Sequence, residues 1–231
     1  MSYPKNPETI ILKNSIYSRG LTELDVWNHY QRFKTTILRE TKNRDLMFVI
    51  MVDINKPIIR RRSGEGFIRL TPQNYDEVIT GRTLSIHSAM GFYEDFGIID
   101  IDIDPSDGFR KAKEVTLEVY DFVMDKMPIV NSANIRYTGK TSFHIHCNFG
   151  KKIKIDVIRD LLRRFLQNSE LAKKYTIEGR RQRGVPNLDM APNKLRGNFI
   201  VLDALSEIGL RCMDVPYQSL MRFEPRQARI K

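Results

Sequence analysis

The stretch Phe96-Gly97-Ile98-Ile99-Asp100-Ile101-Asp102-Ile103-Asp104-Pro105 decides the fold, because three aspartates alternate with isoleucines. Side chains of a β-strand change faces at every residue, so the isoleucines point into a core and the carboxylates share the other face. Carboxylates that lie close together repel one another. A divalent cation between them removes this conflict, and oxygen ligands favour Mg²⁺ or Mn²⁺. The stretch therefore predicts a metal-binding strand; the alternative is a solvated edge strand, where aspartate is disfavoured.

Composition limits the class of protein. The chain has 231 residues, of which 41% are hydrophobic and 29% charged, the mix of a globular protein with a substantial core. It has no run of the roughly 18 apolar residues that a membrane span needs. Residues 1–7 have no apolar signal-peptide core, so we expect an intracellular protein, cytoplasmic or nucleoid-associated. Cys147 and Cys212 lie far apart, which favours reduced thiols over a zinc site.

The net charge is a second clue. The formal charge is +10 at pH 7, beside a strongly acidic strand. A nucleic-acid partner would explain the positive charge, and a metal-bound phosphate would explain the local acid. The alternative is that the positive charge serves solubility alone.

Periodicity predicts a mixed fold. Thr22 is the expected cap of a helix whose apolar positions are Leu24, Trp27, Tyr30, Phe33 and Ile37. From residue 96 onward we expect two strands, a helix, two strands, a helix and a strand, which predicts a mainly antiparallel sheet with helices against it, an α+β architecture. The clearest segments are strands at 46–54, 81–87, 134–137, 143–149 and 198–202, and helices at 106–127 and 155–174.

A polar turn joins the strand at 134–137 to the strand at 143–149. In Thr138-Gly139-Lys140-Thr141-Ser142, two hydroxyls, a lysine and the backbone around the glycine offer donors suited to a triphosphate. The turn lacks the full Gly-x-x-x-x-Gly-Lys-Ser/Thr spacing and leads into a strand, which excludes a P-loop. His144 follows on the polar side of that strand and is placed to donate to a phosphate oxygen.

The order Asp-x-Asp, then Ser-x-His, then a hydrophobic residue and Asp resembles the archaeo-eukaryotic primase superfamily, over roughly residues 80–210. The acidic strand before Pro105, the pair Ile86-His87 and the early helix at Thr22 are similar to the polymerase domain of bacterial end-joining ligase D. The resemblance implies a single catalytic domain over 1–231. It would comprise an N-terminal α/β module of about 1–95 packed on an RRM-like antiparallel-sheet catalytic palm of about 96–231.

The resemblance also implies a set of site residues. Asp102 and Asp104 match the first two metal ligands, and Asp100 would be a further carboxylate on that face. Asp189 is favoured as the third ligand, since residues 183–185 and Asn193 flank it as in the ligase-associated family; Asp203 is the alternative. Ser142 and His144 match the pair that holds the incoming nucleotide. The full set of expected nucleotide contacts is His87, Thr138, Lys140, Ser142, His144, Arg183 and Arg196.

The implied activity is DNA-templated nucleotidyl transfer. Two Mn²⁺ or Mg²⁺ ions would promote the joining of an NTP or dNTP to a 3′-hydroxyl, in primer synthesis or gap-filling repair. Expected partners are a DNA template and primer, with any ligase, helicase or other replication protein on a separate chain. Glu23 stands where the ligase-associated family has a basic residue that reads a downstream 5′-phosphate, which argues against end joining. The alternatives are a metal-dependent nuclease and a non-catalytic RRM-like nucleic-acid-binding module.

Overall fold

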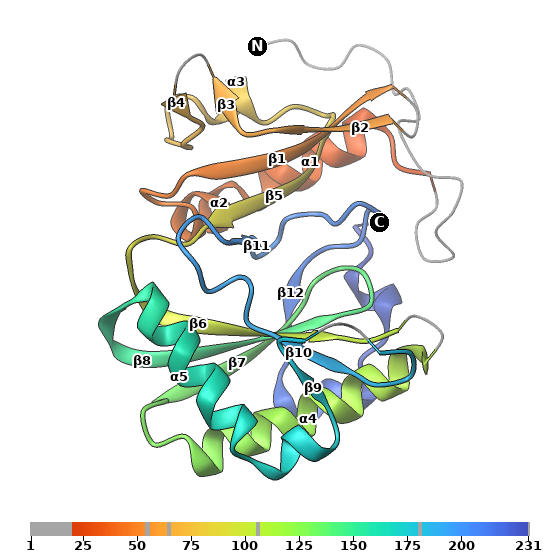
Figure 1. Cartoon of the computed structure of the whole chain (residues 1–231). Helices are drawn as coiled ribbons and strands as arrows, with labels where there is room; N and C mark the ends of the chain where they lie inside the picture. The colour runs from red at the N-terminus through yellow and green to blue at the C-terminus, as the bar shows by residue number, and fades with distance from the viewer. Residues whose placement is uncertain (1–19, 54–55, 64–65, 105–106, 180–181, 231) are drawn as a thin grey trace. The chain divides into compact units, whose positions relative to one another are not determined.

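The computed structural model describes residues 20–53, 56–63, 66–104, 107–179 and 182–230 (Figure 1). The chain forms two compact units, and both combine helices with antiparallel sheet. Unit 1 comprises residues 1–89, 198–213 and 224–231; unit 2 comprises residues 90–197 and 214–223. The sequence-based division gave all of 96–231 to the palm. In the structure, residues 198–213 and 224–231 belong to unit 1 instead. Their assignment depends on long-range pairing, which no local pattern encodes.

Unit 1 is built on a four-stranded sheet with the order β11-β5-β1-β2. Its core includes Tyr30, whose hydroxyl donates to the Leu84 carbonyl at 3.0 Å and accepts from the Leu205 amide at 3.1 Å. The late segment is thereby fixed to the first helix. The elements are α1 (Glu23–Arg32), α2 (Lys34–Glu40), β1 (Leu46–Asp53), β2 (Lys56–Arg60), β3 (Arg62–Ser63), β4 (Gly66–Phe67), α3 (Tyr75–Val78), β5 (Thr83–Ala89), β11 (Asn198–Ile200) and the 3₁₀ turn η4 (Pro225–Ala228).

The first helix begins as its sequence predicts. The Thr22 hydroxyl accepts from the Asp25 amide at 3.2 Å, and the Asp25 carboxylate accepts from the Thr22 amide at 2.8 Å, which is a capping box. The predicted apolar stripe is correct only in part. α1 ends at Arg32 and α2 begins at Lys34, with Phe33 between them. Val26, rather than the predicted Leu24 and Trp27, lies in the core with Tyr30 and Ile37.

Unit 2 is built on a six-stranded sheet with the order β12-β7-β8-β6-β10-β9. Its β9–β10 pair is parallel, and the β6–β8, β7–β8 and β6–β10 pairs are antiparallel. Only one strand of this sheet, β6, precedes the first helix of the unit, so the expectation of two strands from residue 96 onward was wrong. The elements are β6 (Tyr93–Asp102), α4 (Gly108–Lys126), β7 (Ser132–Tyr137), β8 (Phe143–Lys154), α5 (Ile155–Gln167), the 3₁₀ turn η2 (Glu170–Lys173), β9 (Thr176–Ile177), β10 (Asn187–Asp189), β12 (Met213–Asp214) and the 3₁₀ turn η3 (Tyr217–Arg222).

Both long helices of unit 2 lie on one side of its sheet (Figure 1). Ile99 and Ile101 of β6 lie opposite Ile145 and Phe143 of β8 on the apolar face, and all four side chains are fully buried. α5 approaches β6 very closely at Gly97, where an added Cβ would lie 2.6 Å from the Ile158 side chain. The predicted alternation is confirmed for Ile99 and Ile101, whereas Ile98 lies opposite His146 and shares its face with Asp100 and Asp102.

Two further expectations concern the cysteines and the membrane. Cys147 and Cys212 are free, buried thiols, as predicted. Burial raises the pKa of Cys147 to about 12, so that thiol stays protonated. Across the described ranges, no helix is both long and apolar enough to cross a bilayer.

Candidate functional site

The polar face of the unit 2 sheet brings together residues from three distant segments. Asp100 on β6 lies opposite His144 on β8 and opposite Asp189 on β10. Residues directly opposed across antiparallel strands project to the same face. Arg136 on β7 extends the row beyond His144. The row Asp189–Asp100–His144–Arg136 thus crosses four strands, with two carboxylates on β10 and β6 followed by two basic side chains on β8 and β7.

A second row lies at the Asp102 end of β6. Asp102 lies opposite Asn187 of β10. On the other side, β8 begins at Phe143, which lies opposite Ile101, so the register brings the preceding Ser142 to the Asp102 end of the sheet. Asp102 and Asp104 are both partly exposed. Asp104 follows the end of β6, and its carbonyl accepts from the Asp107 amide at 2.9 Å.

The turn between β7 and β8 is closed by its own hydroxyl groups. The Thr138 amide and hydroxyl donate to the Ser142 carbonyl at 3.2 and 3.0 Å, and the two hydroxyl oxygens lie 2.8 Å apart. Gly139 has a φ of 84°, a value that glycine adopts without strain. The Tyr137 hydroxyl donates to the Lys140 carbonyl at 2.8 Å, and Lys140 itself is exposed. The turn therefore holds two hydroxyls together and presents a lysine at its tip.

His144 is held beside a carboxylate. Its side chain is 8% exposed, and Nε2 lies 3.7 Å from Asp100 Oδ1. Arg136, the next residue in the row, donates from Nε to Asp214 Oδ1 at 2.8 Å. His144 thus lies on the carboxylate-bearing face and not among the isoleucines, as the alternation predicts.

His146, two residues further along β8, has a different character. Its ring stacks on Phe96, with centroids 5.6 Å apart and planes at 12°. Burial, followed by the charges of Arg136 and His144, holds its pKa well below the ordinary value. His146 is therefore a neutral, packed ring at physiological pH.

The two contenders for the third carboxylate lie in different units. Asp189 belongs to the sheet of unit 2, and its Oδ1 accepts from the Ala191 amide at 2.7 Å. The fully buried Asn193 then pairs with the backbone of Ile98, accepting from its amide at 2.7 Å and donating to its carbonyl at 2.5 Å. This side chain fixes the segment after Asp189 along β6. Asp203 belongs to unit 1, has a φ of 64°, and lies 3.5 Å from Arg211.

The remaining predicted residues lie outside these two rows. Arg183 and Arg196 are exposed residues of unit 2, and the Arg196 amide donates to the Met90 carbonyl at 3.1 Å. His87 lies on β5 in unit 1, with Nε2 3.1 Å from the Ser85 hydroxyl. Burial lowers the pKa of His87 to about 4, so it is neutral at physiological pH.

The donor set fits a metal ion in its chemistry but not as an assembled cluster. Carboxylate oxygens on one sheet face have the chemistry that Mg²⁺ and Mn²⁺ require. In the part of the chain that the structure describes, however, no group of three or more His, Cys, Asp or Glu side chains lies close enough to hold a metal ion. The expected three-carboxylate centre is therefore supported by the shared sheet face and not by a cluster of side chains.

Asn187 is a further candidate on this face that the sequence analysis did not name. Its side chain is 6% exposed, and its Oδ1 has no hydrogen-bond partner among the described residues. A buried amide oxygen without a partner is costly, by about 1–3 kcal/mol. Asn187 and Asp189 are two residues apart in β10, so their side chains project to the same face of the strand. This spacing can be read from the sequence.

Comparisons with known proteins give one informative result. No protein-family model and no curated protein matches the chain. Among solved structures, it is similar to the polymerase domain from Mycobacterium tuberculosis ligase D in complex with DNA, with a TM-score of 0.71 and 11% sequence identity. The match covers 86% of this chain and 82% of that one. At so low an identity the likeness shows the fold alone, so the conclusion is that the chain has a fold similar to that of the ligase D polymerase domain.

Proposed function

We propose that the chain is a primase-polymerase, a DNA-templated nucleotidyltransferase that joins NTPs or dNTPs to a 3′-hydroxyl. In this proposal unit 2 is an RRM-like catalytic palm. The observation that carries the proposal is the placement of Asp100, Asp189 and His144 in one row on the polar face. The similarity in fold to the ligase D polymerase domain supports it. The role could be primer synthesis or gap filling.

Carboxylates at one end of the sheet would hold the metal ions. Asp102 and Asp104 would bind Mg²⁺ or Mn²⁺, with Asp189 as the third ligand, since it shares its sheet with Asp102 and Asp203 does not. When bound, two such ions activate the 3′-hydroxyl and stabilise the pyrophosphate leaving group. Asp100 and the amide oxygen of Asn187 flank this carboxylate group on the same face.

The β7–β8 turn would hold the triphosphate. The hydroxyls of Thr138 and Ser142 lie together and are suited to donate to phosphate oxygens, and Lys140 supplies a positive charge at the tip. His144 would donate to a phosphate oxygen from the same face. No side chain needs to become a covalent nucleophile, because the 3′-hydroxyl attacks the α-phosphate directly.

Basic residues would contact the nucleic acid and the nucleotide phosphates. The chain carries a formal charge of +10, which favours binding to a polyanion. Arg183 and Arg196 are exposed on unit 2 and would neutralise phosphate charge, while His87 would be a further nucleotide contact. The solved ligase D polymerase domain is in complex with DNA, which makes a template–primer duplex the partner to test first.

A primer-extension assay with Mn²⁺ tests this proposal. The double variant Asp102→Ala/Asp104→Ala should lose nucleotide incorporation. Asp95→Ala, which removes an exposed carboxylate from the same strand, is the matched control and should extend primers normally. Unchanged incorporation by the double variant would falsify the proposal. Shortening of the primer by the wild-type protein without added nucleotide would favour a nuclease instead.

A further inference from the structure

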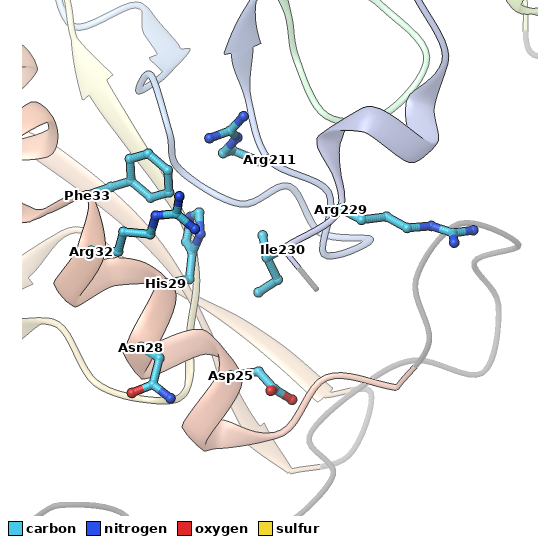
Figure 2. Close-up of a pocket in the computed structure, with 8 residues that line it drawn as sticks. All are labelled: Asp25, Asn28, His29, Arg32, Phe33, Arg211, Arg229 and Ile230. Carbon is cyan, nitrogen blue, oxygen red and sulfur yellow. The ribbon is translucent and has the colours of Figure 1, made fainter.

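Unit 1 contains a basic cavity that the proposed polymerase reaction does not use. The cavity has a volume of about 380 Å³ and is lined by one side of α1 and by the two late segments of the unit (Figure 2). Three arginines line it: Arg32 from α1, and Arg211 and Arg229 from the late segments. Its volume falls within the range of small-molecule sites, roughly 300–1,000 Å³. A phosphate ion alone would leave most of it unfilled.

Two of these arginines converge on one aromatic ring. The guanidinium carbon of Arg211 lies 5.0 Å from the centroid of Phe33, and that of Arg32 lies 5.5 Å from it. Figure 2 shows Arg32 and Phe33 side by side with His29, and Arg211 near the same ring. Contact with the ring orients both guanidinium groups, but it leaves two positive charges close together.

The cavity has more positive than negative charge, because its lining contains three arginines and one acidic residue, Asp25. Arg211 has Asp203 at 3.5 Å, whereas no ion pair of Arg32 or Arg229 is found within the described residues. The Nε of Arg211 is buried and has no hydrogen-bond partner in the same ranges. A buried guanidinium N–H without an acceptor is costly, so an anion placed between the two arginines would satisfy the donor and offset the repulsion.

The pKa of His29 depends in part on the charges of the arginines in this cavity. Its Nε2 donates to the Asp203 carbonyl at 2.7 Å, because a carbonyl oxygen can only accept. Burial lowers the pKa of His29 to about 4; the hydrogen bond to Asp203 opposes this shift, and the charges of Arg211 and Arg32 add to it. The imidazole is therefore neutral and next to two cations.

We propose that this cavity binds a phosphate group carried by a nucleotide-sized molecule, with the phosphate held between Arg32 and Arg211. Phe33 and Ile230 would contact the less polar part of the ligand. Arg32 follows Glu23 by nine positions, which is two and a half helical turns, so their side chains lie on opposite sides of α1. Glu23 therefore does not line the cavity. Glu23 is paired with Arg82. The site needs no metal ion and belongs to unit 1 alone.

Calorimetric titration with AMP in the presence of EDTA tests the proposal. AMP should bind the wild-type protein and also the Asp102→Ala/Asp104→Ala variant, which separates this cavity from the metal-dependent site. Arg32→Gln should weaken AMP binding by about tenfold or more, the loss expected for a charge-assisted contact. Arg39→Gln removes an exposed arginine from α2 in the same unit and should bind AMP like the wild type.

Two further measurements make the result decisive. AMP should raise the pKa of the His29 ring, followed by NMR, because an anion offsets the charges of the two arginines. Inorganic phosphate should bind at least about tenfold more weakly than AMP, since it fills only the guanidinium end of the cavity. The proposal is overturned if AMP leaves the His29 pKa unchanged, if Arg32→Gln and Arg39→Gln bind equally well, or if inorganic phosphate binds as tightly as AMP.

Discussion

Asp189 on β10 lies directly opposite Asp100 on β6, as an antiparallel partner. Asp203, the other contender for the same role, lies in unit 1 within 3.5 Å of Arg211. The two aspartates therefore have different neighbours: one faces further carboxylates across a strand pair, and the other is neutralised by an arginine. Their substitutions should have different consequences.

Asp189→Asn should lower the rate of primer extension by about a hundredfold or more, because an amide is a poor ligand for a divalent ion. Asp203→Asn should change that rate by no more than about threefold and should instead lower the melting temperature, since it leaves Arg211 without its carboxylate. Steady-state kinetics and thermal melts of both variants separate these effects. The reverse pattern would assign the third metal ligand to Asp203.

Asn187→Leu should lower activity without lowering stability. The amide oxygen is buried opposite Asp102 and has no hydrogen-bond partner within the described ranges, so a leucine of similar volume removes an unsatisfied acceptor. If Asn187 serves the site, kcat falls while the melting temperature holds or rises. A clear fall in melting temperature with normal kcat would show that Asn187 is a structural residue.

Ser142→Ala should mainly weaken nucleotide binding. The Ser142 and Thr138 hydroxyls lie 2.8 Å apart, and the backbone bonds that close the turn use the Ser142 carbonyl, which the substitution keeps. We expect the KM for the nucleotide to rise by about tenfold, the value of one charge-assisted hydrogen bond. Thr141→Ala, at the exposed neighbouring position, is the control. Equal KM values for the two variants would remove Ser142 from the nucleotide contacts.

Stability should fall in mild acid. The pKa values of His29 and His87 are both lowered to about 4 in the folded chain, below the ordinary value of 6.5. The unfolded state therefore binds more protons between these values, so stability is complete above about pH 6.5 and declines as the pH falls toward 4. Each histidine contributes at most about 3 kcal/mol to this loss. Urea titrations from pH 7 to 4 should show a shallower decline for His87→Gln; an unchanged slope would contradict this origin.

Gly97→Ala should destabilise unit 2. An added Cβ would lie 2.6 Å from Ile158 Cγ2 and 2.9 Å from Leu162 Cδ1, so these buried side chains of α5 must shift. Overpacking of this kind costs about 1–3 kcal/mol. Gly66→Ala, where no atom lies within 4 Å of the added Cβ, is the matched control for thermal melts. Equal melting temperatures would show that the helix–sheet contact accommodates a methyl group.

Local patterns in the sequence were sufficient for much of the fold. The alternation of aspartate and isoleucine fixed which side of β6 is buried, and the Thr22–Asp25 capping box marked the start of α1. The hydroxyl-rich turn with Gly139 joins two antiparallel strands as expected. Each of these features depends on residues close together in the chain, where stereochemistry alone is decisive.

Features that depend on distant partners were not predictable. Two such features are the pairing of β11 with β5 and the hydrogen bonds of the Asn193 side chain to the backbone of Ile98 in β6. Predicting either requires knowledge of which distant segments meet. The buried face of the first helix carries Val26 instead of Leu24 and Trp27, because tertiary packing outweighed a periodic pattern. The register that sets Asp189 opposite Asp100 is likewise a long-range property; the sequence ranked Asp189 first through its flanking residues instead.

The return of residues 198–213 and 224–231 to unit 1 has a consequence for how this molecule can be dissected. A gene fragment that stops at residue 89 encodes no β11 and none of the arginines from the late segments, and a fragment that begins at residue 90 carries those segments without the sheet they complete. Neither fragment contains the complete sheet of unit 1. No single cut of the chain therefore yields both units intact.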